Sequence, residues 1–214
     1  TRLTPRLKKQ TLNFASMKFQ VVNLGCKVNR VESDDVAACL LSYGLEPASS
    51  HDADVVFVNT CTVTGEADKK ARKAVRHALN SHPNARVVVS GCASAIDPGK
   101  FQEMDPTRVS VIGRSELAGF VQDVVARSTT TNLELGNIKS EDADRLRIGE
   151  GFNTRVNIKV QDGCDNACTY CIVHVARGNA TSRDFSEVVS ECVRYAQNGS
   201  REIVLAGINL GSYN

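Results

Sequence analysis

The chain has 214 residues, of which 42% are hydrophobic and 23% are charged, and its formal net charge is +2. This composition is typical of a globular protein and is sufficient for one large or two small domains. No stretch approaches the roughly 20 apolar residues of a membrane-spanning helix, so we expect no membrane partner. A net charge this small neither requires nor forbids a nucleic-acid partner, because local patches matter more than the sum.

Residues 1–16 are basic and polar and contain no continuous apolar run, so they do not resemble a secretory signal. Met17 has the character of a natural start, and we expect 1–16 to be a disordered extension outside the fold. Eight cysteines are many for this length. Their short spacings are typical of metal ligands or catalytic groups in a reducing cytosol, and not of disulfides. We therefore expect a cytoplasmic protein.

The next part of the chain, residues 17–127, alternates short Val-rich runs with helical patterns. The runs lie at 19–26, 53–61, 85–92 and 108–113, and the helical patterns lie at about 31–43, 65–81, 96–104 and 115–127. Continuous apolar runs of this length predict buried strands of a parallel sheet. Strands that alternate with helices predict βαβ units, and hence an α/β domain with helices on both faces of the sheet.

Three cysteines share one position in this pattern, because Cys26, Cys61 and Cys92 each stand at the carboxyl end of a predicted strand. Those ends lie along one edge of an open parallel sheet, where ligands bind. We therefore predict that the three thiols converge on a metal cluster. The alternative is that they are small buried hydrophobic residues, since free cysteine packs well in cores. Cys39 and Cys192 lie on apolar positions of predicted helices, and we expect them to pack in the core.

The predicted helix at 65–81 has one apolar face and one basic face. The basic side chains are Lys69, Lys70, Arg72, Lys73, Arg76 and His77. Lysine and arginine make most protein contacts to phosphates, so this face is a candidate RNA-binding surface. The alternative is an ordinary solvated helix face.

Residues 128–150 lose the strand–helix rhythm and become polar, which predicts a linker between two domains. The second predicted domain covers 151–214. It contains a predicted strand at 155–161, a helix at 186–197 and a strand at 202–206. This order predicts one further parallel βαβ unit.

A dense group of cysteines follows the first strand of this unit. Cys164, Cys168 and Cys171 form a Cys-x3-Cys-x2-Cys array with a tyrosine before the last thiol. Iron–sulfur cubanes are normally held by four cysteines, so three cysteines leave one iron free to bind a small molecule. The alternative is zinc, because His174 could complete a tetrahedral Cys3His site.

This array resembles the signature of radical S-adenosylmethionine (SAM) enzymes, in which the open iron chelates the amino and carboxylate groups of SAM. The two halves of the chain together resemble the methylthiotransferases, which carry an N-terminal cluster domain followed by a radical SAM domain. The motifs Asn-Leu-Gly-Cys-Lys-Val-Asn at 23–29, Asn-Thr-Cys-Thr-Val-Thr at 59–64 and Gly-Ile-Asn-Leu-Gly at 207–211 resemble the tRNA threonylcarbamoyladenosine branch of that family. Two other branches, which act on isopentenyladenosine in tRNA and on a ribosomal-protein aspartate, usually carry different residues after the first cysteine.

The resemblance implies two [4Fe–4S] clusters and SAM as cofactors. The cluster that reduces SAM would be held by Cys164, Cys168 and Cys171. The auxiliary cluster, which carries the sulfur to be donated, would be held by Cys26, Cys61 and Cys92. The implied reaction adds a methylthio group to C2 of the threonylcarbamoyladenosine beside the tRNA anticodon. An electron donor such as flavodoxin or ferredoxin and a sulfur donor are the implied partners, and Gly207 and Asn209 would line the SAM site.

Two features depart from the family pattern. His174 and Val175 stand where the family usually has a proline and an aromatic residue. The chain also stops after the first two strands of the partial (β/α)6 barrel that the resemblance implies. We therefore expect an inactive fragment that can dimerise through 151–214, because exposed strand edges pair with other chains. The competing interpretations are a methylthiotransferase with another acceptor, and a non-enzymatic iron–sulfur or zinc module that binds RNA or transfers electrons.

Overall fold

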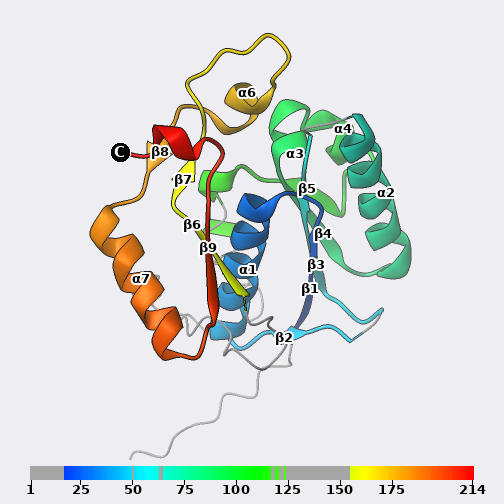
Figure 1. The fold of residues 1–214 in the computed structure, drawn as a ribbon. Coiled ribbons are helices and arrows are strands. Elements are labelled where there is room, and N and C mark those ends of the chain that lie inside the picture. The colour runs from blue at the N-terminus through cyan, green and yellow to red at the C-terminus, as the bar shows by residue number, and fades with distance from the viewer. Residues whose placement is uncertain (1–16, 50, 63–64, 117–118, 121–122, 124–154) are drawn as a thin grey trace, which may run out of the picture.

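The computed structural model describes residues 17–49, 51–62, 65–116, 119–120, 123 and 155–214 (Figure 1). The predicted extension at 1–16 and the predicted linker at 128–150 lie outside the described residues, as does most of the helix predicted at 115–127. At the start of that last range the structure has a short 3-10 helix, η1 (Arg114–Glu116). Within the described ranges, no helix is both long enough and apolar enough to span a bilayer.

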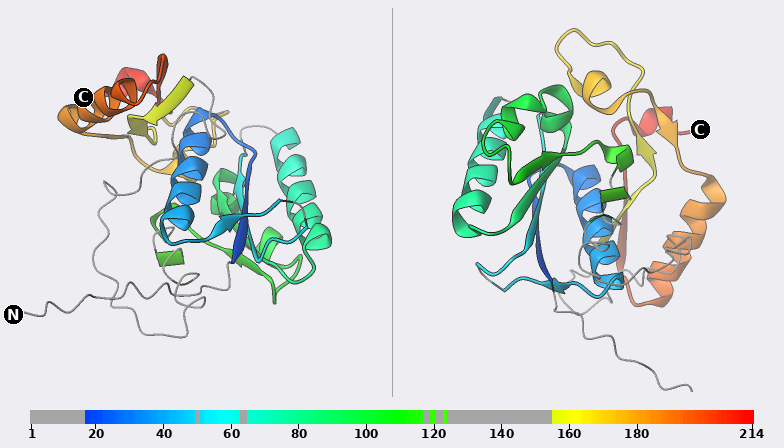
Figure 2. Two further views of the ribbon diagram at one scale, coloured as in Figure 1. Left: turned by 90° about the horizontal axis from the view of Figure 1, so that it is seen from below. Right: turned by 180° about the vertical axis from the view of Figure 1, so that it is seen from behind.

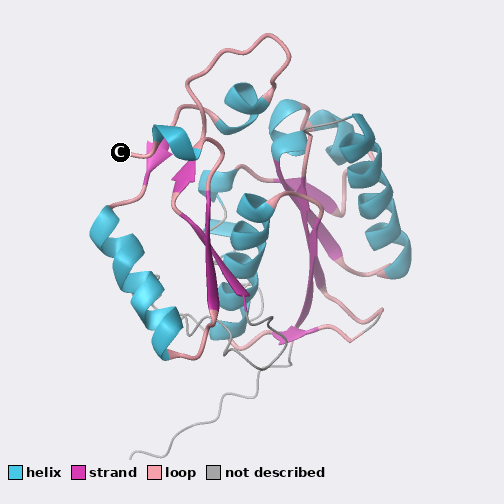
Figure 3. Cartoon of the chain, in the orientation of Figure 1, coloured by secondary structure: helices cyan, strands magenta, loops and turns pink. Residues whose placement is uncertain are grey.

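A five-stranded parallel sheet forms the centre of the first part of the chain (Figure 3). Its strands, in spatial order, are β2 (Glu46–Pro47), β1 (Lys18–Asn23), β3 (Val55–Thr60), β4 (Arg86–Gly91) and β5 (Val109–Val111). Four of them are the predicted strands, whereas β2 is too short to leave a pattern in the sequence. The register pairs Asn23 with Asn59, and Thr60 with Gly91, so the carboxyl ends of β1, β3 and β4 lie side by side. The prediction of an α/β fold is confirmed.

Helices cover both faces of this sheet because its central strands are apolar on both sides. Val56 and Val58 of β3 pack in one cluster with α2 (Gly65–Ser81), whereas Val55 and Phe57 pack in a second cluster with α1 (Lys27–Ser42). All four side chains are at most 2% exposed, and burial of each one contributes about 1.5–3 kcal/mol. Helix α1 begins before the predicted residue 31, because Cys26 already serves as its N-cap.

Two short helices, α3 (Cys92–Ile96) and α4 (Gly99–Gln102), stand in place of the single helix predicted at 96–104, and α3 begins four residues earlier. The prediction of a single helix was wrong because a proline disfavours helical backbone in the residue before it. That residue is Asp97, whose φ and ψ are −143° and 83°. Helix α3 starts at Cys92 itself, directly after β4, so this thiol is placed by regular structure on both sides.

The second part of the chain contains the predicted parallel βαβ unit. It consists of β6 (Arg155–Lys159), α7 (Phe185–Gln197) and β9 (Glu202–Ala206), and β6 pairs with β9 in parallel. Asp184 caps α7, because its carboxylate accepts hydrogen bonds from two backbone N–H groups of the first turn. The connection between β6 and α7 adds β7 (Gln161–Asp162), α6 (Val173–Arg177) and β8 (Thr181–Ser182), and η2 (Leu210–Ser212) follows β9. These short elements were not predicted.

Helix α1 lies between the five-stranded sheet and the β6–β9 pair (Figures 1 and 2). It contacts both β1 and β6, and α6 contacts α3 at the end of β4. The segment that carries the second group of cysteines is therefore placed at the carboxyl edge of the five-stranded sheet, where the first group lies.

Candidate functional site

Three cysteines lie after neighbouring strands at the carboxyl edge of the five-stranded sheet. Because Thr60 pairs with Gly91, the residues that follow β3 and β4, Cys61 and Cys92, occupy equivalent positions at the ends of adjacent strands. Cys26 is the N-cap residue of α1. Cys61 and Cys92 are buried, whereas Cys26 is exposed, so this group reaches the surface at Cys26. We call these three residues the sheet-edge cysteines.

Two buried asparagines connect the segments that carry Cys26 and Cys61. The Nδ2 atom of Asn29 donates to Asn59 Oδ1 (3.0 Å) and to the Thr60 carbonyl (2.9 Å). In return, Asn59 Nδ2 donates to the Asn29 carbonyl (2.9 Å). Both side chains are at most 2% exposed, and a buried amide is costly unless it is hydrogen-bonded. The pair therefore fixes the first turn of α1 against the end of β3.

A second set of contacts fixes Cys61 relative to Cys92. The Thr60 hydroxyl donates to the Ser90 carbonyl (2.7 Å) and accepts from the Ser94 N–H (3.3 Å). Gly91 has a φ of +102°, and a Cβ atom there would lie 2.3 Å from the Thr60 carbonyl oxygen. Only glycine allows this close approach of β3 and β4, so residue 91 determines how near the two thiol-bearing turns can come.

We expect Asn59→Leu to lower the free energy of unfolding by about 2–3 kcal/mol, because it leaves buried donor and acceptor groups of Asn29 without their partner. Urea unfolding followed by circular dichroism measures this change. Asn80→Leu makes the same exchange at an exposed position of α2 and should have little effect. Equal stability of the two variants would contradict a structural role for the buried amide pair.

The second group of cysteines lies in a loop that begins directly after β7. Within the loop, the Cys164 N–H donates to the Gly178 carbonyl (3.0 Å) and the Cys171 N–H donates to the Cys168 carbonyl (3.0 Å). Cys168 is exposed, whereas Cys164 and Cys171 are half-buried. We call these residues the loop cysteines. Their segment is a short, backbone-bonded loop and not a helix or strand, which is the form a chain needs to wrap around a metal centre.

Gln161 holds this loop against the end of β9. Its Oε1 atom accepts from the N–H groups of Ile208 (2.9 Å) and Asn209 (2.8 Å), and its Nε2 atom donates to the Gly163 carbonyl (2.8 Å). The Asn209 amide in turn lies 3.9 Å from Cys164 Sγ. Of the two predicted SAM contacts, Asn209 therefore lies beside a loop cysteine, whereas Gly207 lies against Gln161.

Neither group of thiols has a closed coordination geometry. Among the residues that the structure describes, no three His, Cys, Asp or Glu side chains stand close enough together to hold a metal ion. His174, the predicted fourth ligand of the zinc alternative, has a buried Nδ1 atom without a hydrogen-bond partner in the described part of the chain. The donor chemistry nevertheless fits an iron–sulfur cluster, because both groups consist of free thiols, the ligands that such clusters use.

Arg177 connects the two groups of cysteines. Its side chain is only 1% exposed and forms ion pairs with Glu32 of α1 (3.1 Å) and Asp162 of β7 (2.7 Å). It also donates to Asn29 Oδ1 (2.7 Å). Lys159 pairs with the same two carboxylates, at 3.2 Å from each. Two basic and two acidic side chains thus form one network between α1 and the loop that carries the loop cysteines.

The same network affects ionisation at the sheet edge. Burial raises the pKa of the Cys92 thiol, and the guanidinium groups of Arg177 and Arg114 oppose that rise. Burial alone would raise the pKa of Asp162, but Arg177 and Lys159 outweigh it and lower this pKa. The arginines therefore favour charged forms of groups that would otherwise be neutral when buried.

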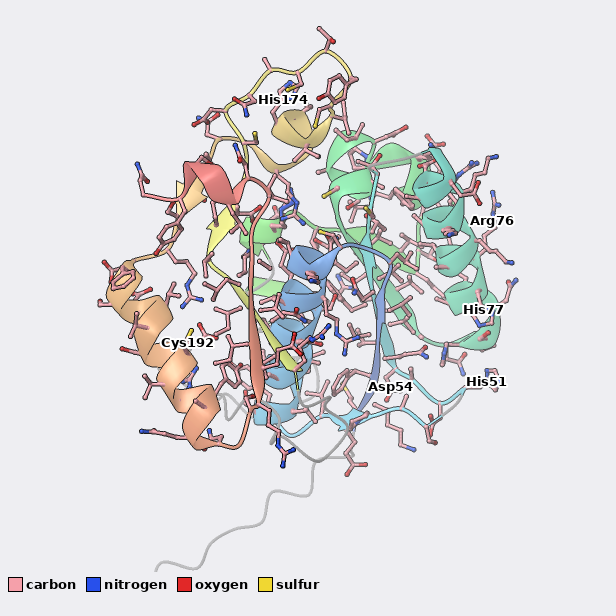
Figure 4. The ribbon with its side chains drawn as sticks, viewed as in Figure 1. His51, Asp54, Arg76, His77, His174 and Cys192 are labelled. Carbon is pink, nitrogen blue, oxygen red and sulfur yellow. The ribbon has the colours of Figure 1, made fainter. Side chains whose placement is uncertain are left out.

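The predicted basic face of α2 is exposed, and Figure 4 shows Arg76 and His77 on the outer side of this helix. Asp68 pairs with Arg72 (3.3 Å) and with Lys100 of the α4 turn (2.9 Å). A groove of about 550 Å³ lies beside these residues. It is lined by Arg72, Arg76, Lys100 and Arg108, together with Glu103, Asp105 and three uncharged residues. The face is basic overall, but part of its charge is already neutralised.

The two remaining cysteines are partly buried and pack against apolar clusters. Cys39 packs against the cluster that contains Phe57, and Cys192 packs against the cluster that contains Ile158. Figure 4 shows Cys192 on the side of α7 that faces β6 and β9. Both therefore contribute to packing.

The residues of the candidate site that were not predicted from the sequence are polar and buried. Asn59 interrupts a valine-rich strand, and this break in the apolar pattern was the available signal for a buried hydrogen-bonded site. Asn29, Gln161 and Arg177 gave no such signal, because their partners are distant in sequence.

Comparison with known protein families gives a match over the sheet region. Residues 18–113 match the family described as "Uncharacterized protein family UPF0004". This range includes the sheet-edge cysteines and ends before the loop cysteines.

Individual relatives cover most of the chain. The Bacillus subtilis threonylcarbamoyladenosine tRNA methylthiotransferase MtaB is 33% identical over 195 residues, which are 89% of this chain and 43% of that protein. The Aquifex aeolicus protein of the same name is 34% identical, over 92% of this chain and 49% of that protein. A Nitratidesulfovibrio vulgaris tRNA-2-methylthio-N(6)-dimethylallyladenosine synthase is 32% identical over 91% of this chain and 45% of that protein. The chain thus spans about half the length of the curated relatives it matches.

Proposed function

The chain belongs to the MtaB-like methylthiotransferase family, and we propose that it supplies the cysteine-bearing part of an enzyme that methylthiolates threonylcarbamoyladenosine in tRNA. The observation that carries the proposal is the position of two groups of three free thiols on either side of Arg177. Each group is placed mainly by polar contacts of neighbouring residues, namely Asn29, Asn59 and Thr60 at the sheet edge and Gln161 and Asp162 at the loop. All six cysteines are free thiols, so they are available as ligands.

In this proposal the sheet-edge cysteines hold an auxiliary [4Fe–4S] cluster and the loop cysteines hold the cluster that binds SAM. Together with SAM, these groups would supply the radical chemistry needed to attach sulfur to an unactivated aromatic carbon. The protein's own contribution is to position these groups relative to one another. Gln161 sets the distance between Cys164 and the end of β9, and Asn209 offers its amide to a ligand at the loop cysteines.

We assign tRNA contact to the basic residues of α2, which are the exposed Lys69, Lys70, Lys73 and Arg76 together with the half-buried Arg72. Their charge suits phosphate groups, which dominate the affinity of proteins for nucleic acids. An external electron donor such as flavodoxin or ferredoxin and a sulfur donor complete the proposed partners. Dimerisation through 151–214 stays a prediction, and the exposed apolar side chains of Phe185, Val189 and Val193 on α7 support it.

A second candidate acceptor is dimethylallyladenosine in tRNA, because a relative named for that reaction is 32% identical to the chain. The test uses the anaerobically reconstituted protein at its full natural length, with SAM, dithionite and sulfide. One sample receives tRNA that carries threonylcarbamoyladenosine, and the other receives tRNA that carries dimethylallyladenosine. Nucleosides are then analysed by mass spectrometry.

We expect the 2-methylthio derivative in the first sample only, and its loss when the sheet-edge cysteines are replaced by serine. Product in the second sample only would establish the second candidate. No product in either sample, from full-length protein that holds iron at both sites, would contradict the assignment of this activity to the protein.

A further inference from the structure

Arg177 has a side chain that is buried by contacts with residues that are distant in sequence, and not by its neighbours along the chain. It lies at the end of α6, directly before Gly178, which is exposed. Its own side chain is 1% exposed and makes polar contacts with three side chains from two other elements. A buried cation is tolerated only when it is paired and its donors are satisfied. The position therefore depends on contacts between segments distant in sequence.

The partners of Arg177 on the sheet side lie next to the sheet-edge cysteines. Asn29 Oδ1 accepts from Arg177 at 2.7 Å and lies 3.5 Å from Cys26 Sγ. Glu32 is one turn further along α1 and is 6% exposed. Arg177 is therefore separated from Cys26 by a single amide oxygen.

The partner on the other side lies next to the loop cysteines. Asp162 pairs with Arg177 at 2.7 Å, and its Oδ1 atom also accepts from the Gly163 N–H at 2.9 Å. Gly163 immediately precedes Cys164. Arg177 thus holds the first residues of the loop against α1.

A second arginine strengthens the same junction. Arg114, in η1, donates to the carbonyl of Ala176, and its Nη1 atom lies 4.0 Å from Cys92 Sγ. Two guanidinium groups, from opposite sides of the junction, therefore lie close to the sheet-edge cysteines. This arrangement provides both a mechanical connection and a fixed positive charge.

We propose that Arg177 is a positioning residue that fixes the loop cysteines against the sheet edge and places a permanent positive charge beside the sheet-edge cysteines. The inference rests on the proposed function for the identity of the group bound there. A fixed positive charge stabilises the reduced, more negative form of a bound iron–sulfur cluster, so it raises the reduction potential. The same guanidinium restrains the loop whether or not a cluster is bound.

The first arm of the test needs no metal. Hydrogen–deuterium exchange of the apo chain compares the unmodified protein with Arg177→Gln. Peptides that cover 161–178 should exchange roughly tenfold faster in the variant, because breaking a buried network that joins two elements permits local opening. Peptides from α2 should be unchanged. Arg183→Gln is the matched control, since Arg183 pairs with Glu191 (2.7 Å) and makes no contact with either group of cysteines among the described residues.

The second arm uses the reconstituted protein and a redox titration followed by electron paramagnetic resonance. Arg177→Gln should retain its iron but show a more negative reduction potential for the cluster at the sheet edge. Arg177→Lys keeps the charge but cannot bridge all three partners, so it should restore the potential while the loop still exchanges faster. A merely structural role would give the same potential for the Gln and Lys variants, and that result would overturn the electrostatic part of the proposal.

Failures of the two proposals are distinguishable. If the unmodified protein binds no iron, the proposed function fails, while the exchange experiment still decides whether Arg177 restrains the loop. Unchanged exchange in 161–178 would overturn the restraint. If Arg177→Gln does not fold, Glu32→Gln replaces it, because this variant removes one partner and leaves the arginine in place. Faster exchange of the loop in Glu32→Gln would support the restraint, and unchanged exchange would overturn it.

Discussion

Replacing Cys164, Cys168 and Cys171 together by alanine should lower the iron content of the anaerobically reconstituted protein from about eight to about four atoms per chain. The reason is that two four-iron clusters, each held by three cysteines, account for about eight irons. Replacing the sheet-edge cysteines should also remove about four irons, and replacing both groups should remove nearly all. Iron and acid-labile sulfide assays measure these changes, and zinc is measured in the same samples.

The chain contains its own control for this experiment. Cys39 and Cys192 pack against apolar clusters, so the Cys39→Ala and Cys192→Ala variants should keep the full iron content. A loss of iron in these variants would mean that the assay reports general destabilisation. Stoichiometric zinc without iron in the unmodified chain would contradict the two-cluster proposal, and would favour the zinc alternative with His174 as a ligand.

The sheet and its two layers of helices could be predicted from sequence because they depend on local patterns. Val56 and Val58 face one helix while Val55 and Phe57 face another, so residues 55–58 form a continuous apolar run. This run predicts a parallel strand buried on both faces. The position of Cys61 and Cys92 at the strand ends followed directly from these runs.

The junction between the two groups of cysteines could not be predicted in the same way. Arg177 and Glu32 are 145 residues apart, and no periodic pattern connects them. The antiparallel pair of β7 and β8 has only two residues in each strand, which is too short for alternation to be visible. What holds the candidate site together is thus a set of single long-range polar contacts, whereas what forms the fold is a repeated apolar pattern.

Gly163→Ala should abolish iron binding by the loop cysteines and leave the cluster at the sheet edge intact. Gly163 has a φ of +69°, and a Cβ atom there would lie 1.9 Å from the Asn179 carbonyl oxygen. A contact this short between the new Cβ atom and a backbone oxygen can be relieved only if one side of the loop moves. Because Cys164 is the next residue and its N–H bonds to the Gly178 carbonyl, the displacement would move the first ligand directly. Iron per chain should fall from about eight to about four.

Gly199→Ala is the matched control for this prediction. Gly199 also has a positive φ, +93°, but a Cβ atom there would meet nothing within 4 Å. Its cost is therefore limited to the strain of the left-handed backbone, about 1–2 kcal/mol, at the end of α7 and far in sequence from the loop cysteines. If Gly163→Ala and Gly199→Ala keep the same iron content, the close approach at residue 163 does not position Cys164, and the loop cysteines are held by Gln161 and Arg177 instead.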